Sequence, residues 1–457
     1  MHTSNCPGLL HIVPALDGGI CRIRLAGGVL DAAHALALAA AADRHAAGPI
    51  ELTNRANLQV RGVRAGREAD FSAELIAAGL GPGGRCDLDA QAAAALDGVR
   101  NVMTSPVAGR DPHASIDTRA LAEQILDLLQ NEPRFPRLSP KFALLLDGGE
   151  RLAMLAHPHD IWLAAIADDA ARDVRFAFGL AGCPPSNDDA HGNANTTPLG
   201  TVRPSQVPAL VRALLHTFLD FASSFDGAQR MRDLLAAGHP AEAVWQRASA
   251  SLDFAPEPAP AGWRRAAADP SLRFGAHRQR DAERWWIGAQ PPLGRIDTAT
   301  LRALADLARR ATGSRSLHVT PWQGVLLPDV ASRDVADTLA SLARLGFACE
   351  ANAPFARLIA CSGSAGCARG LADTRADALA LAARLPAKAE VHLSGCRRSC
   401  AAAHRAPYTL LAVAPGRYDL YRRNGGTTGF GDRVAHDASI ALAAETLDKL
   451  VRSTPDV

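Results

Sequence analysis

Hydrophobic and polar positions follow two alternating spacings along this chain, and their order predicts an α+β fold. Apolar residues recur at i, i+3 and i+4 over 33–46 and 299–312, which is the spacing of an amphipathic helix. A strand-like segment and a glycine turn precede each of these stretches, and two strand-like segments and a second helix follow it. This order predicts two ferredoxin-like half domains.

The two half domains are predicted to be copies of one another. The segment IELTNRANLQVRGV at 50–63 resembles LHVTPWQGVLLPDV at 317–330. Three pairs of identical residues stand at the same separation of 267 positions: Thr53 and Thr320, Gly27 and Gly294, and Gly79 and Gly346. A constant separation over this whole stretch indicates an internal duplication without gaps.

A second pattern follows each half domain and predicts a pair of α/β modules. The first module is expected to contain a helix over 117–131, and the second a helix over 371–385. The first also carries a polar, turn-rich loop at 183–200, expected to be exposed, and a helical extension. The predicted division is therefore 6–85 and 263–352 for the half domains, and 95–250 and 353–450 for the modules.

Composition narrows the function classes without naming one. Hydrophobic residues make up 48% and charged residues 21% of the 457 positions, which is ordinary for a globular protein. A formal net charge of +2 gives no support to nucleic-acid binding. The chain has no apolar run long enough for a membrane span, and its first residues do not resemble a signal peptide. We therefore expect a cytoplasmic protein, in which thiols are free or bound to metal.

Four of the nine cysteines are grouped in two short windows, LIACSGSAGC and VHLSGCRRSC. Cys361 and Cys367 form a C-x5-C pair, and Cys396 and Cys400 form a C-x3-C pair that one helical turn could present together. Thiolates suit zinc, copper(I) and iron–sulfur clusters. Zinc knuckles usually have closer spacings, so the pattern favours a [4Fe–4S] cluster, with zinc or unliganded thiols as alternatives. The remaining cysteines show no paired spacing and are expected to be inert: Cys6, Cys21, Cys86, Cys183 and Cys349.

Cationic and amide side chains gather in three segments of the first half. They are predicted to bind an anionic substrate: Arg55, Gln59, Arg61, Arg100, Asn101 and Lys141. Period-two alternation would place Arg55, Asn57, Gln59 and Arg61 on one strand face, which meets either solvent or a polyanion. Only three lysines occur in the chain, and arginine is the usual cation elsewhere. A lysine at position 141 therefore suggests that a compact positive charge is needed there. Near the last cysteine, Arg397, Arg398, His404 and Arg405 are either exposed or close to the site.

These motifs together carry a resemblance. The cysteine spacing, with TNRANLQVRGV, RNVMTSP and SPKF, resembles the nitrite/sulfite reductase superfamily. The resemblance implies an internally duplicated fold with ferredoxin-like half domains and two cofactor-binding modules. It implies a [4Fe–4S] cluster on the four cysteines beside sirohaem, and an anion site over the tetrapyrrole that includes Arg55, Arg100 and Lys141.

Within the superfamily, two segments are most similar to the precorrin-3B synthase family: CPGLLHIVPALDGGICRIRLAGG near the start and LHVTPWQGVLLPDV in the second copy. This resemblance implies an oxygen-dependent monooxygenase of aerobic cobalamin biosynthesis. Such an enzyme hydroxylates precorrin-3A at C20 with formation of a γ-lactone. It is implied to use O2, a [4Fe–4S] cluster, an additional non-haem iron and an electron donor, expected to be NADH through a reductase.

Three departures from the reductases support this choice. A second lysine after KF is replaced by Ala143, the TxxQN motif reads TPWQG with Gly324, and the cysteine loop reads GCRRSC. The loss of one cation argues against reduction of a small oxyanion and makes sirohaem the less favoured cofactor. The alternatives are a sirohaem-dependent nitrite or sulfite reductase and a non-catalytic iron–sulfur or zinc module. No ligand spacing for the second iron stands out among HPHD at 157–160, His392 and His404.

Overall fold

The computed structural model describes residues 6–83, 89–168, 173–186, 197–224, 227–402, 406–423 and 429–453. Cys86, His404, Arg405 and residues 187–196 of the predicted exposed loop lie outside these ranges. The helical extension expected after that loop is present as three helices: α5 (Val207–Ser224), α6 (Met231–Ala236) and α7 (Ala241–Ser249).

The two half domains have the same order of elements, which confirms the predicted duplication. The first contains β1 (Val13–Ala15), β2 (Gly18–Ile23), β3 (Val29–Asp31), α1 (Ala32–His45), β4 (Ile50–Leu52), β5 (Leu58–Val63) and α2 (Glu68–Ala77). The second contains β11 (Gly275–Arg278), β12 (Arg284–Ala289), β13 (Arg295–Ile296), α8 (Thr298–Ala311), β14 (Ser316–Val319), β15 (Val325–Ala331) and α9 (Val335–Arg344). Gly27 and Gly294 both have left-handed backbone, with φ of 58° and 67°.

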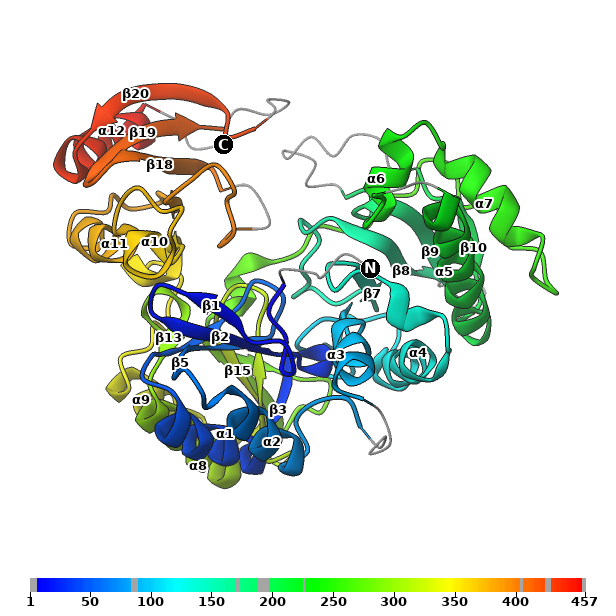
Figure 1. The fold of residues 1–457 in the computed structure, drawn as a ribbon, viewed down its shortest axis with the longest axis horizontal. Helices are drawn as coiled ribbons and strands as arrows, with labels where there is room; N and C mark the ends of the chain where they lie inside the picture. The colour runs from blue at the N-terminus through cyan, green and yellow to red at the C-terminus, as the bar shows by residue number, and fades with distance from the viewer. Residues whose placement is uncertain are drawn as a thin grey trace.

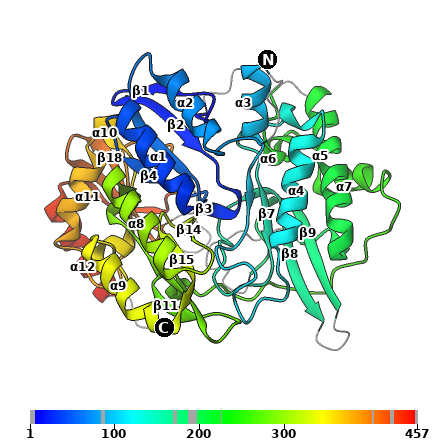
Figure 2. The same cartoon turned by 90° about the horizontal axis from the view of Figure 1, so that it is seen from below.

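The half domains exchange a strand, which the sequence pattern did not predict. Strand β3 pairs with β14 of the second half, and β13 pairs with β4 of the first half, so each five-stranded sheet contains one strand from the other copy. Helices α1 and α8 lie side by side under the sheets (Figures 1 and 2). One apolar core includes Leu38 of α1 and Leu304 of α8. The two copies therefore form a single folded body.

Glycine makes this exchange sterically feasible. Gly28, directly before β3, has a φ of +76°, which is strained for any residue with a side chain. A Cβ atom at Gly28 would also lie 2.3 Å from the carbonyl oxygen of Val319, in the strand that β3 joins. The backbone can approach β14 closely only because no side chain is present there.

The two modules share a second topology. The first contains α3 (Ala90–Gly98), β6 (Val102–Met103), α4 (Arg119–Asn131), β7 (Leu144–Asp147), β8 (His159–Asp168), β9 (Asp173–Gly182) and β10 (Gly200–Val202). The second contains β16 (Leu358–Ala360), α10 (Gly363–Gly366), α11 (Thr374–Ala382), β17 (Val391–Ser394), β18 (Tyr408–Ala414), β19 (Arg417–Arg422), β20 (Asp432–Ala438) and α12 (Ile440–Arg452). In each, three parallel strands are followed by two antiparallel ones.

The modules flank the paired half domains. In Figure 1 the first module lies on the right, from cyan to green, and the second lies at the upper left, from yellow to red. Loops at the carboxyl ends of parallel strands are the usual place for a ligand site in such sheets. In the second module these are the loops after β16 and β17, which carry the four grouped cysteines.

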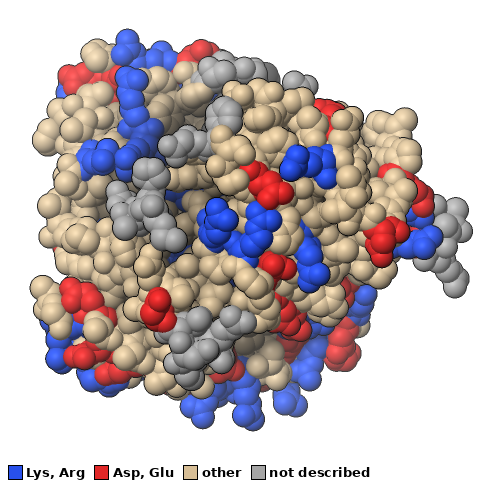
Figure 3. All heavy atoms as spheres, turned by 45° about the vertical axis from the view of Figure 1, so that its right-hand side comes forward, with Lys and Arg blue, Asp and Glu red and all other residues tan. Residues whose placement is uncertain are grey.

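Charged side chains of both signs are interspersed over the face shown in Figure 3, as expected from the small net charge. Within the described ranges, no helix combines the length and the apolar character that a bilayer span requires.

Candidate functional site

Two adjacent parallel strands position the first cysteine of each window. Cys361 directly follows β16, and Cys396 follows β17 after Gly395, while Ala360 and Leu393 are paired in the sheet. The Cys361 amide donates to the Leu393 carbonyl oxygen at 3.2 Å. The Gly395 amide donates to the Cys361 Sγ at 3.1 Å. The sheet register therefore brings the two cysteine windows together.

The second cysteine of each window, Cys367 or Cys400, lies close enough to interact electrostatically with the other thiols. Cys367 follows α10, and its amide donates to the Gly363 carbonyl oxygen at 2.9 Å. Burial of the thiol, and then the neighbouring thiols of Cys396 and Cys361, raise the pKa of Cys400, although the residue as a whole is exposed. Four thiolates this close repel one another, so a cationic centre among them would stabilise the charged set.

Glycines leave little room for side chains around these thiols. A Cβ atom on Gly366 would lie 2.7 Å from Arg61 Nη2, and one on Gly370 would lie 2.4 Å from the Gly363 carbonyl carbon. Gly395 has the Cys361 Sγ 3.4 Å from the place of its missing Cβ. The prediction of a helical turn from Cys396 to Cys400 is wrong: these residues form bends and turns, with Ser399 at a φ of 52°. The turn residues between the thiols, Arg397 and Arg398, are exposed.

The donor set fits a thiolate-bound cluster. Cys361, Cys367, Cys396 and Cys400 would hold it, and the amide of Gly395 already donates to one of the four sulfurs, as expected around an iron–sulfur cluster. Within the described ranges, no three His, Cys, Asp or Glu side chains are grouped as a single metal ion would need. We therefore assign no ligands to the additional non-haem iron and derive no step from it.

A tight turn at 53–57 connects the cysteine loop to a second region. Thr53 Oγ1 accepts hydrogen bonds from the amides of Arg55 and Asn57, at 3.4 and 3.1 Å. Asn54 Nδ2 donates to the Cys400 carbonyl oxygen at 3.2 Å. On the other side, Arg55 Nη1 donates to the Lys141 carbonyl oxygen at 3.3 Å. Neighbouring residues of one turn therefore face the thiols and the first module.

The predicted strand face is only partly correct. Strand β5 begins at Leu58, so Arg55 and Asn57 belong to the turn and do not alternate with Gln59 and Arg61. Asn57 is buried, and its Oδ1 accepts a hydrogen bond from the Leu25 amide at 2.9 Å. The polar side chains of this segment consequently point to different places.

Three of the six predicted substrate residues line one pocket, which we call the arginine pocket. Arg55, Arg100 and Asn101 contribute to it, together with Ala143 and two buried histidines, His157 and His159. It encloses about 450 Å³, part of which is open to solvent. Arg100 Nη1 is buried without a hydrogen-bond partner among the described residues. The pocket thus has cationic donors available to an anion.

Positive charge is concentrated around this pocket. Burial, and then repulsion from Arg230 and Arg22, lower the pKa of Arg55 to about 10. Arg230 is held by Asp160, whose Oδ2 accepts from Arg230 Nε at 2.8 Å. Arg22 Nη2 donates to Gln59 Oε1 at 3.0 Å, and its charge interacts with Cys400. Three arginines that repel one another favour a ligand with several negative groups.

Buried partners orient Arg100 and Asn101. Asp97 lies 3.6 Å from Arg100 Nη1 and forms an ion pair of 2.7 Å with Arg24, and both Asp97 and Arg24 are almost fully buried. Asn101 Oδ1 accepts from Arg24 Nε at 3.2 Å, and its Nδ2 donates to the Pro140 carbonyl oxygen at 3.0 Å. Asn101 therefore shapes the wall more than it offers free groups.

The structure places Gln59 and Arg61 outside the arginine pocket. Gln59 Nε2 donates to Glu51 Oε2 at 3.0 Å, and Glu51 also pairs with Arg375 of the second module. Arg61 is buried, forms a 2.6 Å ion pair with Asp17, and donates to the Gly366 carbonyl oxygen at 2.7 Å. These bonds attach the cysteine loops to the first half domain. A direct contact of either residue with substrate stays a prediction.

Lys141 is exposed, and its backbone rather than its ammonium group contacts Arg55. Its predicted role in anion binding also stays a prediction.

Sequence reasoning missed four residues at or beside the pocket: Arg22, Arg230, His157 and His159. Arg22 stands opposite Gln59 in the β2–β5 pairing, so strand alternation could have identified it. The histidines stand in HPHD, a segment whose spacing indicates no metal site and gives no hint of this pocket. Burial, and then the charge of Arg55, lower the pKa of His159 to about 3, so this imidazole is neutral. Its Nδ1 is buried without a hydrogen-bond partner among the described residues.

The first module carries an ion pair where the second carries thiols. Asp147 ends β7, as Ser394 ends β17, and pairs with Arg265 at 2.6 Å. The duplicated strand ends have therefore acquired different chemistry.

Comparison with known proteins agrees with this architecture. The family model described as "Nitrite and sulphite reductase 4Fe-4S domain" matches residues 95–237. The model described as "Nitrite/Sulfite reductase ferredoxin-like half domain" matches residues 14–78 and 277–345. The first match covers the first module, and the four grouped cysteines lie beyond it. Together the two models account for more than half of the chain.

Individual relatives cover nearly the whole chain. A precorrin-3B synthase of Sinorhizobium sp is 29% identical over 465 aligned positions, covering 100% of this chain and 90% of the relative. A ferredoxin–nitrite reductase of Synechococcus elongatus is 27% identical, covering 93% and 82%. The solved structure of the Mycobacterium tuberculosis NirA protein superposes with a TM-score of 0.75 at 21% identity, covering 95% of this chain and 80% of that one, which shows the shared fold. From its duplicated fold, its two matched domain types and these relatives, the chain belongs to the nitrite/sulfite reductase superfamily of oxidoreductase enzymes.

Proposed function

We propose that this protein is an oxygen-dependent monooxygenase that hydroxylates precorrin-3A at C20 with formation of a γ-lactone, the activity of a precorrin-3B synthase. One oxygen atom of O2 enters the product, and the other leaves as water with two electrons and two protons from the donor. We expect the electrons to come from NADH through a reductase. A precorrin-3B synthase is among the relatives that span the whole chain, at 29% identity.

One structural observation carries the proposal: the 53–57 turn joins the thiol set to the arginine pocket. Asn54 binds the carbonyl oxygen of Cys400, and Arg55 of the same turn lines the pocket. A cluster held by the four thiols would supply electrons beside this turn. A tetrapyrrole with many carboxylates matches the concentrated positive charge of Arg22, Arg55, Arg100 and Arg230 better than a small anion does.

The residues of this chain have separable tasks in that reaction. Arg55 and Arg100 would bind carboxylates, since both side chains line the pocket and the planar guanidinium group matches a carboxylate. Asp97 and Arg24 would orient Arg100 through their buried ion pair. His159, neutral at physiological pH, would offer a hydrogen bond without adding charge. The Ala143 methyl group lines the pocket where the resembled reductases carry a lysine, so the pocket lacks one cation for a small oxyanion.

The second candidate is a sirohaem-dependent nitrite or sulfite reductase. The 27% identity to a ferredoxin–nitrite reductase over most of both chains favours it, as do Arg55 and Arg100 in one pocket. The Ala143 replacement argues against it. Sirohaem in extracts of anaerobically purified protein, together with consumption of nitrite or sulfite by the reduced protein, would select this candidate.

An isotope experiment tests the primary proposal. Reduced protein, purified without air, is incubated with precorrin-3A and oxygen-18 gas. The molecular mass of the product is then measured by mass spectrometry. We expect one labelled oxygen atom in the product, because the hydroxyl oxygen comes from O2. A product of unchanged mass, or one labelled only from oxygen-18 water, would exclude the monooxygenase assignment.

A further inference from the structure

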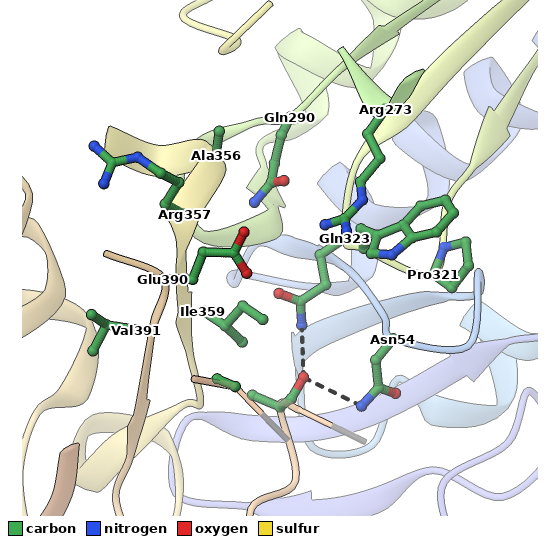
Figure 4. Close-up of a pocket in the computed structure, with 13 residues that line it drawn as sticks. Asn54, Arg273, Gln290, Pro321, Gln323, Ala356, Arg357, Ile359, Glu390 and Val391 are labelled. Carbon is green, nitrogen blue, oxygen red and sulfur yellow. Dashed lines mark hydrogen bonds between the residues drawn. The ribbon is translucent and has the colours of Figure 1, made fainter. Parts of the chain in front are cut away.

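A second pocket lies on the other side of the 53–57 turn, between the second half domain and the second module (Figure 4). We call it the Arg273 pocket. The residues relevant here are Arg273, Gln290, Trp322, Gln323, Glu390 and Ala401. The pocket encloses about 490 Å³, part of it open to solvent. Asn54 also lines it, so one turn separates it from the arginine pocket.

Arg273 presents a guanidinium group that has no bonded anion in the part of the chain that the structure describes. Its side chain forms no hydrogen bond or ion pair with any residue in the described ranges, and its Nε is buried. The guanidinium carbon lies 4.9 Å from the centre of the Trp322 ring, which supports it from one side. Burial lowers the pKa of Arg273, so the surroundings already disfavour its charge. Burying a cation without a counter-ion costs free energy, and a bound anionic ligand would offset this cost.

The backbone holds Arg273 in place. Arg273 is the last residue of a short 3-10 helix, Pro270–Arg273, and this helix lies against β12. A Cβ atom on Gly288 of β12 would lie only 2.1 Å from the Arg273 carbonyl oxygen, so this contact requires glycine. Trp286 Nε1 also donates to the Leu272 carbonyl oxygen at 3.4 Å. The guanidinium therefore points into the pocket from a fixed backbone rather than from a loose surface segment (Figure 4).

Other polar groups of the pocket define what could lie beside Arg273. Gln323 Nε2 and Asn54 Nδ2 both donate to the Ala401 carbonyl oxygen, at 3.4 and 3.3 Å, next to Cys400 (Figure 4). Gln323 Oε1 is left buried without a partner among the described residues. The Glu390 carboxylate faces the same space (Figure 4), and its charge raises the pKa of Arg273 in opposition to the effect of burial.

We propose that the Arg273 pocket is a carboxylate-binding site, in which the guanidinium of Arg273 takes the carboxylate and Gln323 Oε1 accepts a neighbouring N–H or O–H of the ligand. The planar fork of an arginine matches a carboxylate with two hydrogen bonds. The carboxylate comes either from a side arm of the tetrapyrrole, which rests on the proposed function, or from a free small organic acid, which does not.

The test compares the wild type with Arg273→Gln in anaerobically purified, full-length protein. Isothermal titration calorimetry measures binding of two probes, uroporphyrin I as a stable tetrapyrrole polycarboxylate and succinate as a free acid. Loss of a charged hydrogen bond should weaken binding of one probe by about tenfold or more. Arg278→Gln is the matched control, since Arg278 also lies over a tryptophan, Trp285, at 5.2 Å but is exposed and outside the pocket. We expect it to change neither affinity.

The pattern of losses identifies the source of the carboxylate. Weaker uroporphyrin binding by Arg273→Gln indicates a tetrapyrrole arm, whereas weaker succinate binding with unchanged uroporphyrin binding indicates a free acid. Glu390→Gln should increase the affinity for the probe whose binding Arg273→Gln weakens, because it removes a negative charge that repels the carboxylate of the probe. Equal affinities of wild type and Arg273→Gln for both probes, or binding of neither probe by the wild type, would overturn the proposal.

Two measurements separate these outcomes from misfolding and from failure of the proposed function. The melting temperature of ligand-free Arg273→Gln should equal or exceed that of the wild type, because the substitution removes an unpaired charge. A large fall would show that Arg273 is structural and would contradict the proposal. Oxygen-18 incorporation into precorrin-3A is measured separately, so a wild type that turns over but has no carboxylate site refutes only this inference.

Discussion

At the scale of single residues, the arginines of this protein divide by whether a carboxylate accompanies them. Arg24, Arg61 and Arg265 are buried and form ion pairs of 2.7 Å or less with Asp97, Asp17 and Asp147. Their donors are occupied, so they connect parts of the fold. Among the described residues, the Arg55 side chain has only a backbone carbonyl oxygen as a hydrogen-bond acceptor, and other arginines repel it. Such a residue gains most from an anionic ligand.

The first prediction concerns Arg55. Arg55→Ala should weaken binding of uroporphyrin I by about 1–3 kcal/mol, the scale of a lost charged hydrogen bond. Titration calorimetry measures this change. Arg309→Ala, which removes an exposed arginine near the end of α8, is the control and should leave the affinity unchanged. Undiminished binding by Arg55→Ala would show that Arg55 does not bind the ligand and that its side chain faces solvent.

The second prediction concerns the thiols. Cys400→Ser should lose the iron–sulfur cluster and destabilise the second module, because a hydroxyl is a poor replacement for a thiolate ligand. Iron and sulfide per chain, measured after anaerobic purification, report the loss. Cys349→Ser is the control, since Cys349 is half-buried in the second half domain and belongs to neither window. Full iron and sulfide content in Cys400→Ser would disprove the ligand assignment.

At the scale of elements, short segments connect distant parts of the chain. The 53–57 turn contacts the Cys400 loop on one side and Lys141 of the first module on the other. Glu51 of β4 accepts a hydrogen bond from Gln59 and forms an ion pair with Arg375. This ion pair attaches the second module to the first half domain beside the thiols. Strands β3 and β13 each extend the sheet of the other copy. The position of the site therefore depends on both half domains at once.

The third prediction tests the strand exchange. Gly28→Ala should destabilise the protein by about 2–4 kcal/mol, since it adds a steric clash to a strained backbone conformation. Gly66→Ala is a matched control: Gly66 also has a positive φ, of +81°, but nothing lies within 4 Å of its Cβ position. We expect the control to lose only about 1 kcal/mol.

Chemical denaturation measures both Gly variants, with probes in each half domain. Because the sheets are shared, both half domains of Gly28→Ala should unfold in one transition at lower denaturant. Loss of the first half domain alone, or equal costs for the two variants, would argue against the exchange.

At the scale of the whole molecule, buried neutral histidines make stability depend on pH. His318 of β14 is buried, and its Nδ1 lies 2.8 Å from the Pro106 carbonyl oxygen of the first module, which it reaches as a donor. Burial, and then the charge of Arg110, lower the pKa of His318 to about 4. The unfolded chain binds this proton near its ordinary pKa of about 6.5, whereas the folded protein does not. Stability present above that pH is therefore lost as the pH falls toward 4.

The fourth prediction follows from that sign. His318→Asn keeps a donor for Pro106 but removes the titration, so its stability should fall less between pH 7 and pH 5.5. The expected difference from the wild type is about 1 kcal/mol over this interval. Denaturant unfolding at the two pH values measures it. Equal losses of stability in wild type and variant would show that the pKa of His318 is the same in the folded and unfolded protein.

Much of the fold was predictable because its signals are local. Helical periodicity predicted α1 and α8 within a residue or two of their observed ends. The repeated separation of Thr53 and Thr320 predicted the duplication, and both threonines do the same work: Thr320 Oγ1 accepts from the Gly324 amide as Thr53 Oγ1 does from Asn57. The two cysteine windows were recognisable from spacing alone, and the structure places Cys361 and Cys396 just after adjacent strands.

The candidate site was predictable only in part. Arg55 and Arg100 were identified from their motifs, but the alternation assumed for 55–61 ignored the tight turn at 53–57, after which β5 begins at Leu58. Arg230, directly before α6, gave no signal, because only its tertiary ion pair with Asp160 places its charge near Arg55. Arg273 lies in a short helix whose sequence indicates no binding role, and only its position over Trp322 shows it facing a pocket.

The sequence alone determined which elements form, that they occur twice, and which four cysteines gather in two short windows. These features depend on residues near one another in the chain, where hydrophobic spacing and turn chemistry act directly. Only the tertiary structure decided which arginines share a pocket, which are occupied by carboxylates, and which strands change partners. Those outcomes depend on the packing of segments hundreds of residues apart, and no local pattern specifies the register in which such segments meet.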